Sequence, residues 1–125
     1  MKTHPVNQKG LIFIAHGSHN KSANAEIEKF VAILKEKNKN KYTCINHAFL
    51  QFSKPSIEDV INLQIKLRMN EIVFFSYFLT HGNHVVNDIP LLVDAYQKKF
   101  PEIAFTILPV FGASSHLASL INRLI

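Results

Sequence analysis

Four short, continuous apolar runs recur along this chain of 125 residues, and an amphipathic stretch follows each of them. The runs are rich in β-branched and aromatic residues, which is typical of strands buried on both faces. The stretches between them carry apolar residues at helical spacing. Such alternation predicts a parallel sheet covered by helices, with right-handed crossovers. The four runs span 11–15, 43–50, 71–78 and 103–108.

The order of these elements is βαβαβαβα, which favours an α/β fold of three αβα layers. We expect a four-stranded parallel sheet in the flavodoxin-like order 2-1-3-4, flanked by helices. No linker or low-complexity tract divides the chain, so residues 1–125 form one domain and residues 1–9 a short N-terminal extension. Polar residues before the helical patterns predict helix caps. The candidates are Asn20 or Ser22, Ser56 with Asp59, Asp88 with Pro90 in the first turn, and Ser114 or Ser115.

The composition limits the classes of function. Hydrophobic residues make up 47% and charged residues 18%, which predicts a packed core rather than disorder. No apolar run approaches the ~18 residues that a membrane span needs, and the first residues lack a signal-type stretch, so we expect a cytoplasmic protein without a membrane partner. The net charge of +5 favours an anionic ligand, but no nucleic-acid-binding motif is present. The single cysteine, Cys44, is read as a small buried side chain.

Histidines follow two of the predicted strands at the points where those strands end. His16 comes directly after the first strand, and His81 and His84 flank a glycine after the third. The carboxyl ends of parallel strands share one edge of a sheet, where ligands bind. If strands one and three are neighbours, His16 and the His81/His84 pair face one crevice. Imidazoles there can hold a metal, accept protons or do both, although a histidine after a strand is also a common structural loop residue.

Other chemistries have weaker support. The chain lacks a phosphate-binding Gly-Lys-Ser/Thr loop and a GxGxxG fingerprint. Ser18 lacks the sharp strand-to-helix motif of a nucleophilic serine. The backbone of Gly17 and Ser18, before a helix, could bind a phosphate or a carboxylate.

Four segments together resemble the small class II chelatases of the CbiX type. They are "IFIAHGSHNKSAN", "AFLQFSKPSIEDVI", "SYFLTHGNHVVNDIP" and "LPVFGASSHL". The likeness is collinear from about Gly10 to the end of the chain. The His-Gly-Ser piece alone is common, whereas its combination with G-x-H-V-x-x-D-I-P at this distance is fairly specific.

The resemblance implies a lyase that inserts a divalent metal into sirohydrochlorin, an anionic tetrapyrrole, and works as a homodimer. The metal is a substrate, Co²⁺ first and Fe²⁺ or Ni²⁺ as alternatives, and no prosthetic group is implied. His16 and His84 are the implied metal ligands and catalytic residues. Residues expected to contact the tetrapyrrole are Gly17, Ser18, Gln51, His81, Gly82 and Asp88.

One position departs from the family pattern. A glutamate commonly follows Phe-Leu after the second strand, and here Gln51 stands there. An amide keeps an acceptor oxygen but takes no proton at neutral pH. His81 or His47 could supply the base instead. Gln51 therefore leaves open a non-catalytic tetrapyrrole- or metal-binding protein on the same fold. A third possibility is an unrelated flavodoxin-like module with structural histidines.

Overall fold

The computed structural model describes residues 7–80 and 84–125, with residues 84–86 described through their backbone alone. Four parallel strands form one sheet in the order β2-β1-β3-β4, which confirms the predicted topology. The strands are β1 (Lys9–Ala15), β2 (Cys44–Phe49), β3 (Glu71–Ser76) and β4 (Ala104–Ile107). The helices are α1 (Lys21–Lys37), α2 (Ile57–Lys66), α3 (His84–Lys99) and α4 (Ser115–Leu124), with a 3₁₀ turn, η1 (Phe111–Ala113), before the last.

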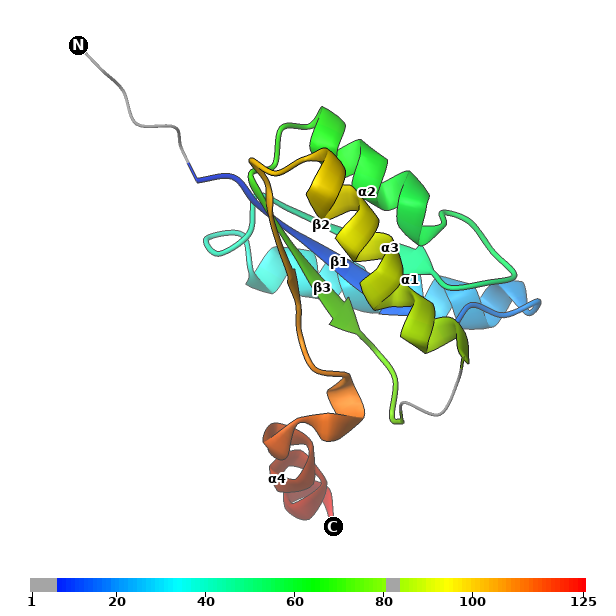
Figure 1. Ribbon diagram of the computed structural model, residues 1–125. Helices are drawn as coiled ribbons and strands as arrows, with labels where there is room; N and C mark the ends of the chain where they lie inside the picture. The colour runs from blue at the N-terminus through cyan, green and yellow to red at the C-terminus, as the bar shows by residue number, and fades with distance from the viewer. Residues whose placement is uncertain (1–6, 81–83) are drawn as a thin grey trace.

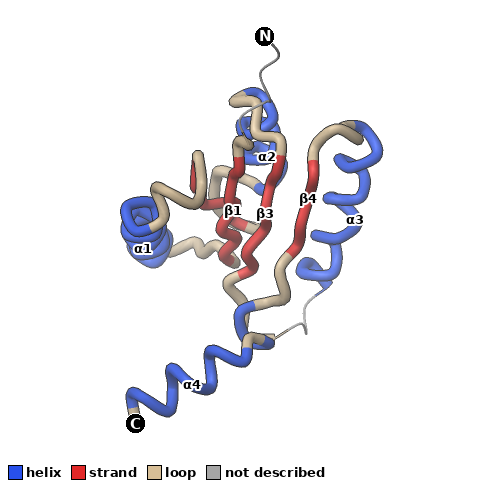
Figure 2. Tube along the Cα trace, turned by 90° about the vertical axis from the view of Figure 1, so that its left-hand side faces the viewer, coloured by secondary structure: helices blue, strands red, loops and turns tan. Residues whose placement is uncertain are grey.

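Three layers result from the direction of the crossovers. The helices α2 and α3 lie side by side over one face of the sheet, and α1 covers the other (Figures 1 and 2). The chain moves one way along the sheet from β1 to β2, and the opposite way from β2 to β3 and from β3 to β4. Right-handed connections therefore place α1 on the face opposite α2 and α3.

Each face of the sheet has its own apolar core. Alternate residues of the strands point to alternate faces, so Ile12 and Phe74 pack under α2 and α3 while Phe13 and Val73 pack under α1. On the α1 side the helix contributes the buried Val31, with Ile27 and Leu34 packed around it. Burial on both faces explains why the strands read as continuous apolar runs.

The starts of α1, α2 and α4 confirm the sequence predictions. The Asn20 side chain accepts a hydrogen bond from the Ser22 N–H, and the Ser114 side chain accepts one from the His116 N–H. At α2 the Ser56 hydroxyl accepts from the Asp59 N–H, and the Asp59 carboxylate accepts from the Ser56 N–H. These two bonds form the predicted capping box. Hydrogen bonds from Ser56 to the Asp59 carboxylate, that of the backbone N–H first, favour its ionised form and lower the pKa of Asp59.

The predicted start of α3 at Asp88 is wrong. The helix begins at His84, so Asp88 lies in its second turn and Pro90 lies inside the helix. Proline at this position has no N–H to donate to the carbonyl four residues earlier, which removes one hydrogen bond of the helical ladder. An aspartate two residues before a proline is a common signal for a helix start, but here the chain is already helical before Asp88.

The last helix is present but is not packed on the sheet. Helix α4 extends beyond the carboxyl ends of the strands, away from the three layers (Figures 1 and 2). None of its residues is buried. In the described ranges, no helix has both the length and the apolar character to cross a bilayer.

Replacing the cap of α2 tests the local energetics. We expect Ser56→Ala to lower the free energy of unfolding by about 1 kcal/mol, because the Asp59 N–H loses its acceptor. Urea unfolding at neutral pH measures this difference. Ser53→Ala is the control, since its hydroxyl makes a long 3.4 Å contact with the Lys54 carbonyl. Equal stability of the two variants would contradict the assigned cap.

Candidate active site

The ends of β1, β2 and β3 meet at one edge of the sheet. Ala15 pairs with Phe49 and Ile14 pairs with Ser76, so the three strands end almost level. The pairing continues past the strands, because the Gln51 N–H donates to the His16 carbonyl at 3.0 Å. His16 and Gln51 therefore leave the sheet next to each other.

The imidazole of His16 lies on an apolar floor at this edge. Its ring centroid is 4.3 Å from that of Phe78, which is buried just after β3. The His16 residue is itself exposed. An imidazole held against a buried aromatic ring but open to solvent can accept a metal or a proton from a bound ligand.

Gly17 allows the tight turn after His16. Its φ is +86°, a region that disfavours any side chain, and a Cβ there would overlap the backbone carbonyl oxygen of Gln51. The close approach of the two loops thus requires glycine. It also fixes the Gln51 backbone against the turn that carries His16.

Asn24, on the first turn of α1, holds the same loop from the other side. It is buried, and its side chain accepts from the Ser18 N–H at 3.0 Å and donates to the Ser18 carbonyl at 2.8 Å. The Ser18 N–H is thus engaged inside the chain, while the Ser18 hydroxyl accepts from the Asn20 N–H. The loop between β1 and α1 is therefore held by a two-bond clamp that the sequence pattern does not reveal.

The structure describes some of the other predicted residues fully, some through the backbone alone and some not at all. His84 is the first residue of α3 and so follows β3, the neighbour of β1, but its side chain is not described. His81 and Gly82 lie outside the described residues. Asp88 is exposed and lines a hollow of ≈ 320 Å³ between the starts of α2 and α3, together with Ser56 and Leu50.

Two further aromatic groups stand at the rim of this edge. Phe52 is exposed and has a φ of +68°, which is unusual for a residue with a side chain. Its ring lies 4.2 Å from that of His19, measured between centroids. Backbone strain at an exposed aromatic side chain beside Gln51 suggests a functional constraint. Nothing in the spacing of His19 and Phe52 along the sequence indicates this contact.

His47 does not reach the edge. It lies inside β2 opposite Phe13, on the face covered by α1. Burial lowers the pKa of His47, and nearby Lys35 lowers it further while Glu28 opposes the change. The ring is therefore mostly neutral at pH 7, but its place in the strand separates it from His16.

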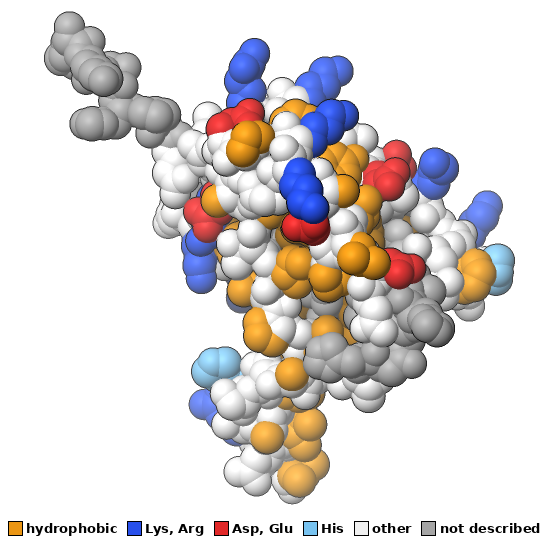
Figure 3. Space-filling view, viewed as in Figure 1, with side chains coloured by type: hydrophobic (Ala, Val, Ile, Leu, Met, Phe, Trp, Pro, Cys, Tyr) orange, Lys and Arg blue, Asp and Glu red, His pale blue; other side chains and the backbone are white. Residues whose placement is uncertain are grey.

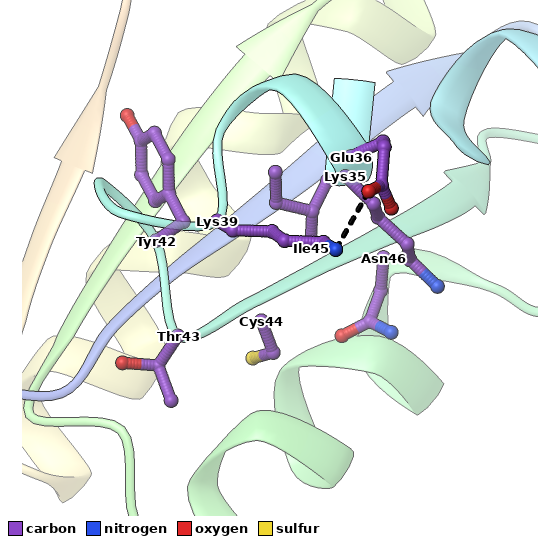
Figure 4. A pocket seen from close by; sticks show the side chains of 8 residues that line it. All are labelled: Lys35, Glu36, Lys39, Tyr42, Thr43, Cys44, Ile45 and Asn46. Carbon is purple, nitrogen blue, oxygen red and sulfur yellow. Dashed lines mark ion pairs between the residues drawn. The ribbon is translucent and has the colours of Figure 1, made fainter. Parts of the chain in front are cut away.

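Cys44 lines a hollow of ≈ 340 Å³ at the other end of β2 (Figure 4). The Lys39 and Glu36 side chains form an ion pair at 2.6 Å across its rim. Burial raises the pKa of the Cys44 thiol, with Lys35 acting in the opposite sense, so the thiol is protonated at neutral pH. Cys44 begins β2, so this hollow lies at the opposite edge of the sheet from His16 and is no part of the candidate site.

Helix starts make this edge of the sheet favourable for anions. Helices α1, α2 and α3 run antiparallel to the strands, so their N-termini lie at the carboxyl edge of the sheet, where they favour anions. The basic residues of their last turns lie at the opposite edge, and Figure 3 shows several Lys and Arg side chains at the top of the molecule. Lys21 and Lys54 are the cations next to the helix starts.

In the part of the chain that the structure describes, no three His, Cys, Asp or Glu side chains are grouped to hold a metal. The described part of the site thus offers the imidazoles of His16 and His19, the amide of Gln51 and the aromatic ring of Phe52. Its chemistry is ligation and proton acceptance at His16, with hydrogen bonding at Gln51.

Comparison with known proteins identifies the family. The CbiX family model matches residues 10–125. This match covers most of the chain, which therefore belongs to the CbiX family, and the resemblance read from the sequence is confirmed.

Two curated relatives carry chelatase names. The chloroplastic sirohydrochlorin ferrochelatase of Arabidopsis thaliana is 31% identical over 113 residues, which are 90% of this chain and 49% of that protein. The sirohydrochlorin cobaltochelatase of Methanococcus aeolicus is 31% identical over 85 residues, 68% of this chain and 58% of that protein. The chain thus spans about half the length of the curated relatives it matches.

Solved structures share the fold. One is a CbiX protein of Marinobacter aquaeolei VT8, whose name assigns it to cobalamin biosynthesis. Its TM-score is 0.73 at 19% identity, and the match covers 93% of this chain and 92% of that one. SirB from Bacillus subtilis with Fe³⁺ has a TM-score of 0.77 at 19% identity, covering 93% of this chain and 45% of that one. At this level of identity the comparison confirms the α/β fold.

The Asn24 clamp can be tested directly. We expect Asn24→Asp to lower the free energy of unfolding by about 1–3 kcal/mol, because a carboxylate cannot donate to the Ser18 carbonyl and is buried beside it. Hydrogen exchange at the Ser18 and Asn20 amides should become faster.

Asn62→Asp is the matched control for this clamp. It makes the same change of charge on the exposed face of α2 and keeps the acceptor for the Tyr96 hydroxyl. Urea unfolding and exchange of wild type and both variants provide the comparison. An Asn24→Asp protein as stable as Asn62→Asp would show that the clamp contributes little.

Proposed function

We propose that this protein is a sirohydrochlorin chelatase, working as a homodimer, that inserts a divalent metal into the tetrapyrrole. The observation that carries the proposal is the placement of His16 and His84 after adjacent strands at the carboxyl edge of the sheet. Membership of the CbiX family supports the same chemistry. The metal, Co²⁺ or Fe²⁺ or Ni²⁺, is a substrate, and relatives with both cobalt and iron names leave the choice open.

The reaction requires the metal to approach the ring and two pyrrole N–H protons to leave. We assign metal presentation to the imidazoles of His16 and His84, which can accept protons once the metal has transferred. The Phe78 ring lies against that of His16 and offers an apolar contact there. The rings of Phe52 and His19 offer an apolar rim for the macrocycle.

The carboxylates of the tetrapyrrole need partners at the same edge. The N-termini of α1, α2 and α3 converge there, and Lys21 and Lys54 stand beside two of them. We assign carboxylate binding to these groups, with the Gly17 backbone and the residues around Asp88.

Removing the imidazoles tests the chemistry. We expect His16→Ala and His84→Ala each to slow metalation by about 10²–10⁴-fold, the usual contribution of a general acid–base group. An anaerobic absorbance assay with sirohydrochlorin and Co²⁺, Fe²⁺ or Ni²⁺ follows the reaction against a no-protein blank. His116→Ala is the control, because His116 is exposed on α4. Unchanged multi-turnover rates in both site variants would contradict the roles assigned to His16 and His84.

Gln51 favours a second candidate, a tetrapyrrole- or metal-binding protein without turnover. The two candidates differ in the effect of Gln51→Glu, which adds a charge and a proton acceptor beside His16. For a chelatase, we expect wild type to turn over and Gln51→Glu to be severalfold faster at neutral pH. For a binder, wild type matches the blank while shifting the tetrapyrrole spectrum.

Gln8→Glu is the matched control for the Gln51 change. It adds the same charge at the amino edge of the sheet, where the Gln8 N–H bonds to Asn70. A slower Gln51→Glu enzyme beside an unchanged Gln8→Glu enzyme would contradict the role given to this position.

A further inference from the structure

A hollow of ≈ 380 Å³ lies between His16 and the first turns of α1. Three segments of the chain line it: the loop from His16 to Ser18, the start of α1, and Tyr77, which follows β3. Helix α1 contributes Glu26 to this lining. The hollow therefore brings a carboxylate to the same space as the imidazole of His16, on the side of the site away from Gln51.

The packing of α1 fixes the position of Glu26. Asn24 binds the Ser18 backbone through both ends of its amide, which holds the start of the helix against the loop after β1. One turn after Glu26, the ring of Phe30 lies 6.0 Å from that of Tyr77, measured between centroids. Residues four apart share one side of a helix, so Glu26 lies on the same side as Phe30 and one turn nearer the carboxyl edge of the sheet.

The charge of Glu26 is not neutralised by its surroundings. The residue is exposed and forms no ion pair with the part of the chain that the structure describes. Among the described residues that line the hollow, Glu26 is the only acidic one, and none is Lys or Arg. A cation is therefore favoured in this hollow over the carboxylates of an anionic tetrapyrrole, which would meet a like charge there.

A negative charge beside His16 is what the other side of the site lacks. Gln51, whose N–H donates to the His16 carbonyl, carries a neutral amide. Imidazoles alone add no charge to offset a divalent ion. Imidazole together with carboxylate is a ligand combination that holds Fe²⁺ while leaving other positions of the ion open. Glu26 with His16 provides this combination from the described chain.

We propose that the hollow between His16 and α1 is the docking site of the incoming metal, with Glu26 and His16 as ligands. The inference rests on the proposed chelatase function and adds a metal-binding residue to it. Two side chains leave most positions of the ion to water, so the ion is held weakly, as a metal in transit requires. His16 borders both the hollow and the edge assigned to the macrocycle, so the ion can leave Glu26 without leaving His16.

Titration with Co²⁺ alone tests this site without the tetrapyrrole. We expect Glu26→Gln to raise the dissociation constant about tenfold or more, since even the partners of metal ligands usually contribute that much. Calorimetry and the visible absorbance of bound Co²⁺ follow the binding. Circular dichroism and urea unfolding check that each variant folds.

Glu28→Gln is the matched control for the titration. It removes the same charge from α1, but Glu28 is exposed and does not line the hollow. Co²⁺ affinity that falls in Glu26→Gln and stays at the wild-type value in Glu28→Gln supports the docking site. Equal affinity of Glu26→Gln and wild type overturns it, as does a wild type that binds no Co²⁺ at millimolar concentration.

Steady-state metalation separates docking from a role in the chemical step. Removing a group that binds the metal equally before and during its transfer raises KM and leaves kcat unchanged. We expect this pattern for Glu26→Gln when Co²⁺ is varied at a fixed concentration of sirohydrochlorin. An unchanged KM for Co²⁺, with or without a lower kcat, overturns the docking role. A wild type without turnover whose Co²⁺ binding still depends on Glu26 would contradict the chelatase function and keep the docking site.

Discussion

The pairing of β1 with a strand on each side is the constraint on which the rest of this structure depends. Because β1 is central, His16 leaves the sheet between the end of β2, which leads to Gln51, and the end of β3, which leads to Phe78. A slip of one residue in this register would turn every core side chain to the other face. The two separate cores, one per face, make such a slip costly, so the positions at the carboxyl edge are set by packing far from it.

Much of this frame could be predicted because its signals are local. Strands buried on both faces read as apolar runs, and the start of α2 contains the whole Ser56–Asp59 capping box within four residues. Strand order and right-handed crossovers then bring His16 and the start of α3 to one edge without any knowledge of side-chain contacts. The position of His16 could be predicted for this reason, since it depends on the end of one strand and on one neighbour.

The contacts that shape the site could not be predicted, because they join residues through backbone atoms or across long stretches of chain. Asn24 is a polar residue among the apolar positions of α1, and its partner is the backbone of Ser18, which has no sequence signature. Phe52 and His19 are 33 residues apart and meet only because Gly17 lets their two loops touch. The sequence predicts the start of α3 four residues too late, because Asp88 and Pro90 have the pattern of a helix start but lie inside the helix.

Charged and apolar side chains are distributed unevenly over the surface, and this distribution bears on the proposed homodimer. The proposed substrate is a flat macrocycle with two faces, and the described residues at the carboxyl edge of this sheet form one wall, with His16 on Phe78 and the rim at Phe52. Lysines on the last turns of the helices lie at the far edge, where they favour solubility and keep the amino edges of two copies apart. Exposed apolar side chains lie on α4 instead, where Leu124 and Ile125 are 76% and 96% exposed. In the homodimer proposed above, a second copy would supply a wall for the other face of such a macrocycle.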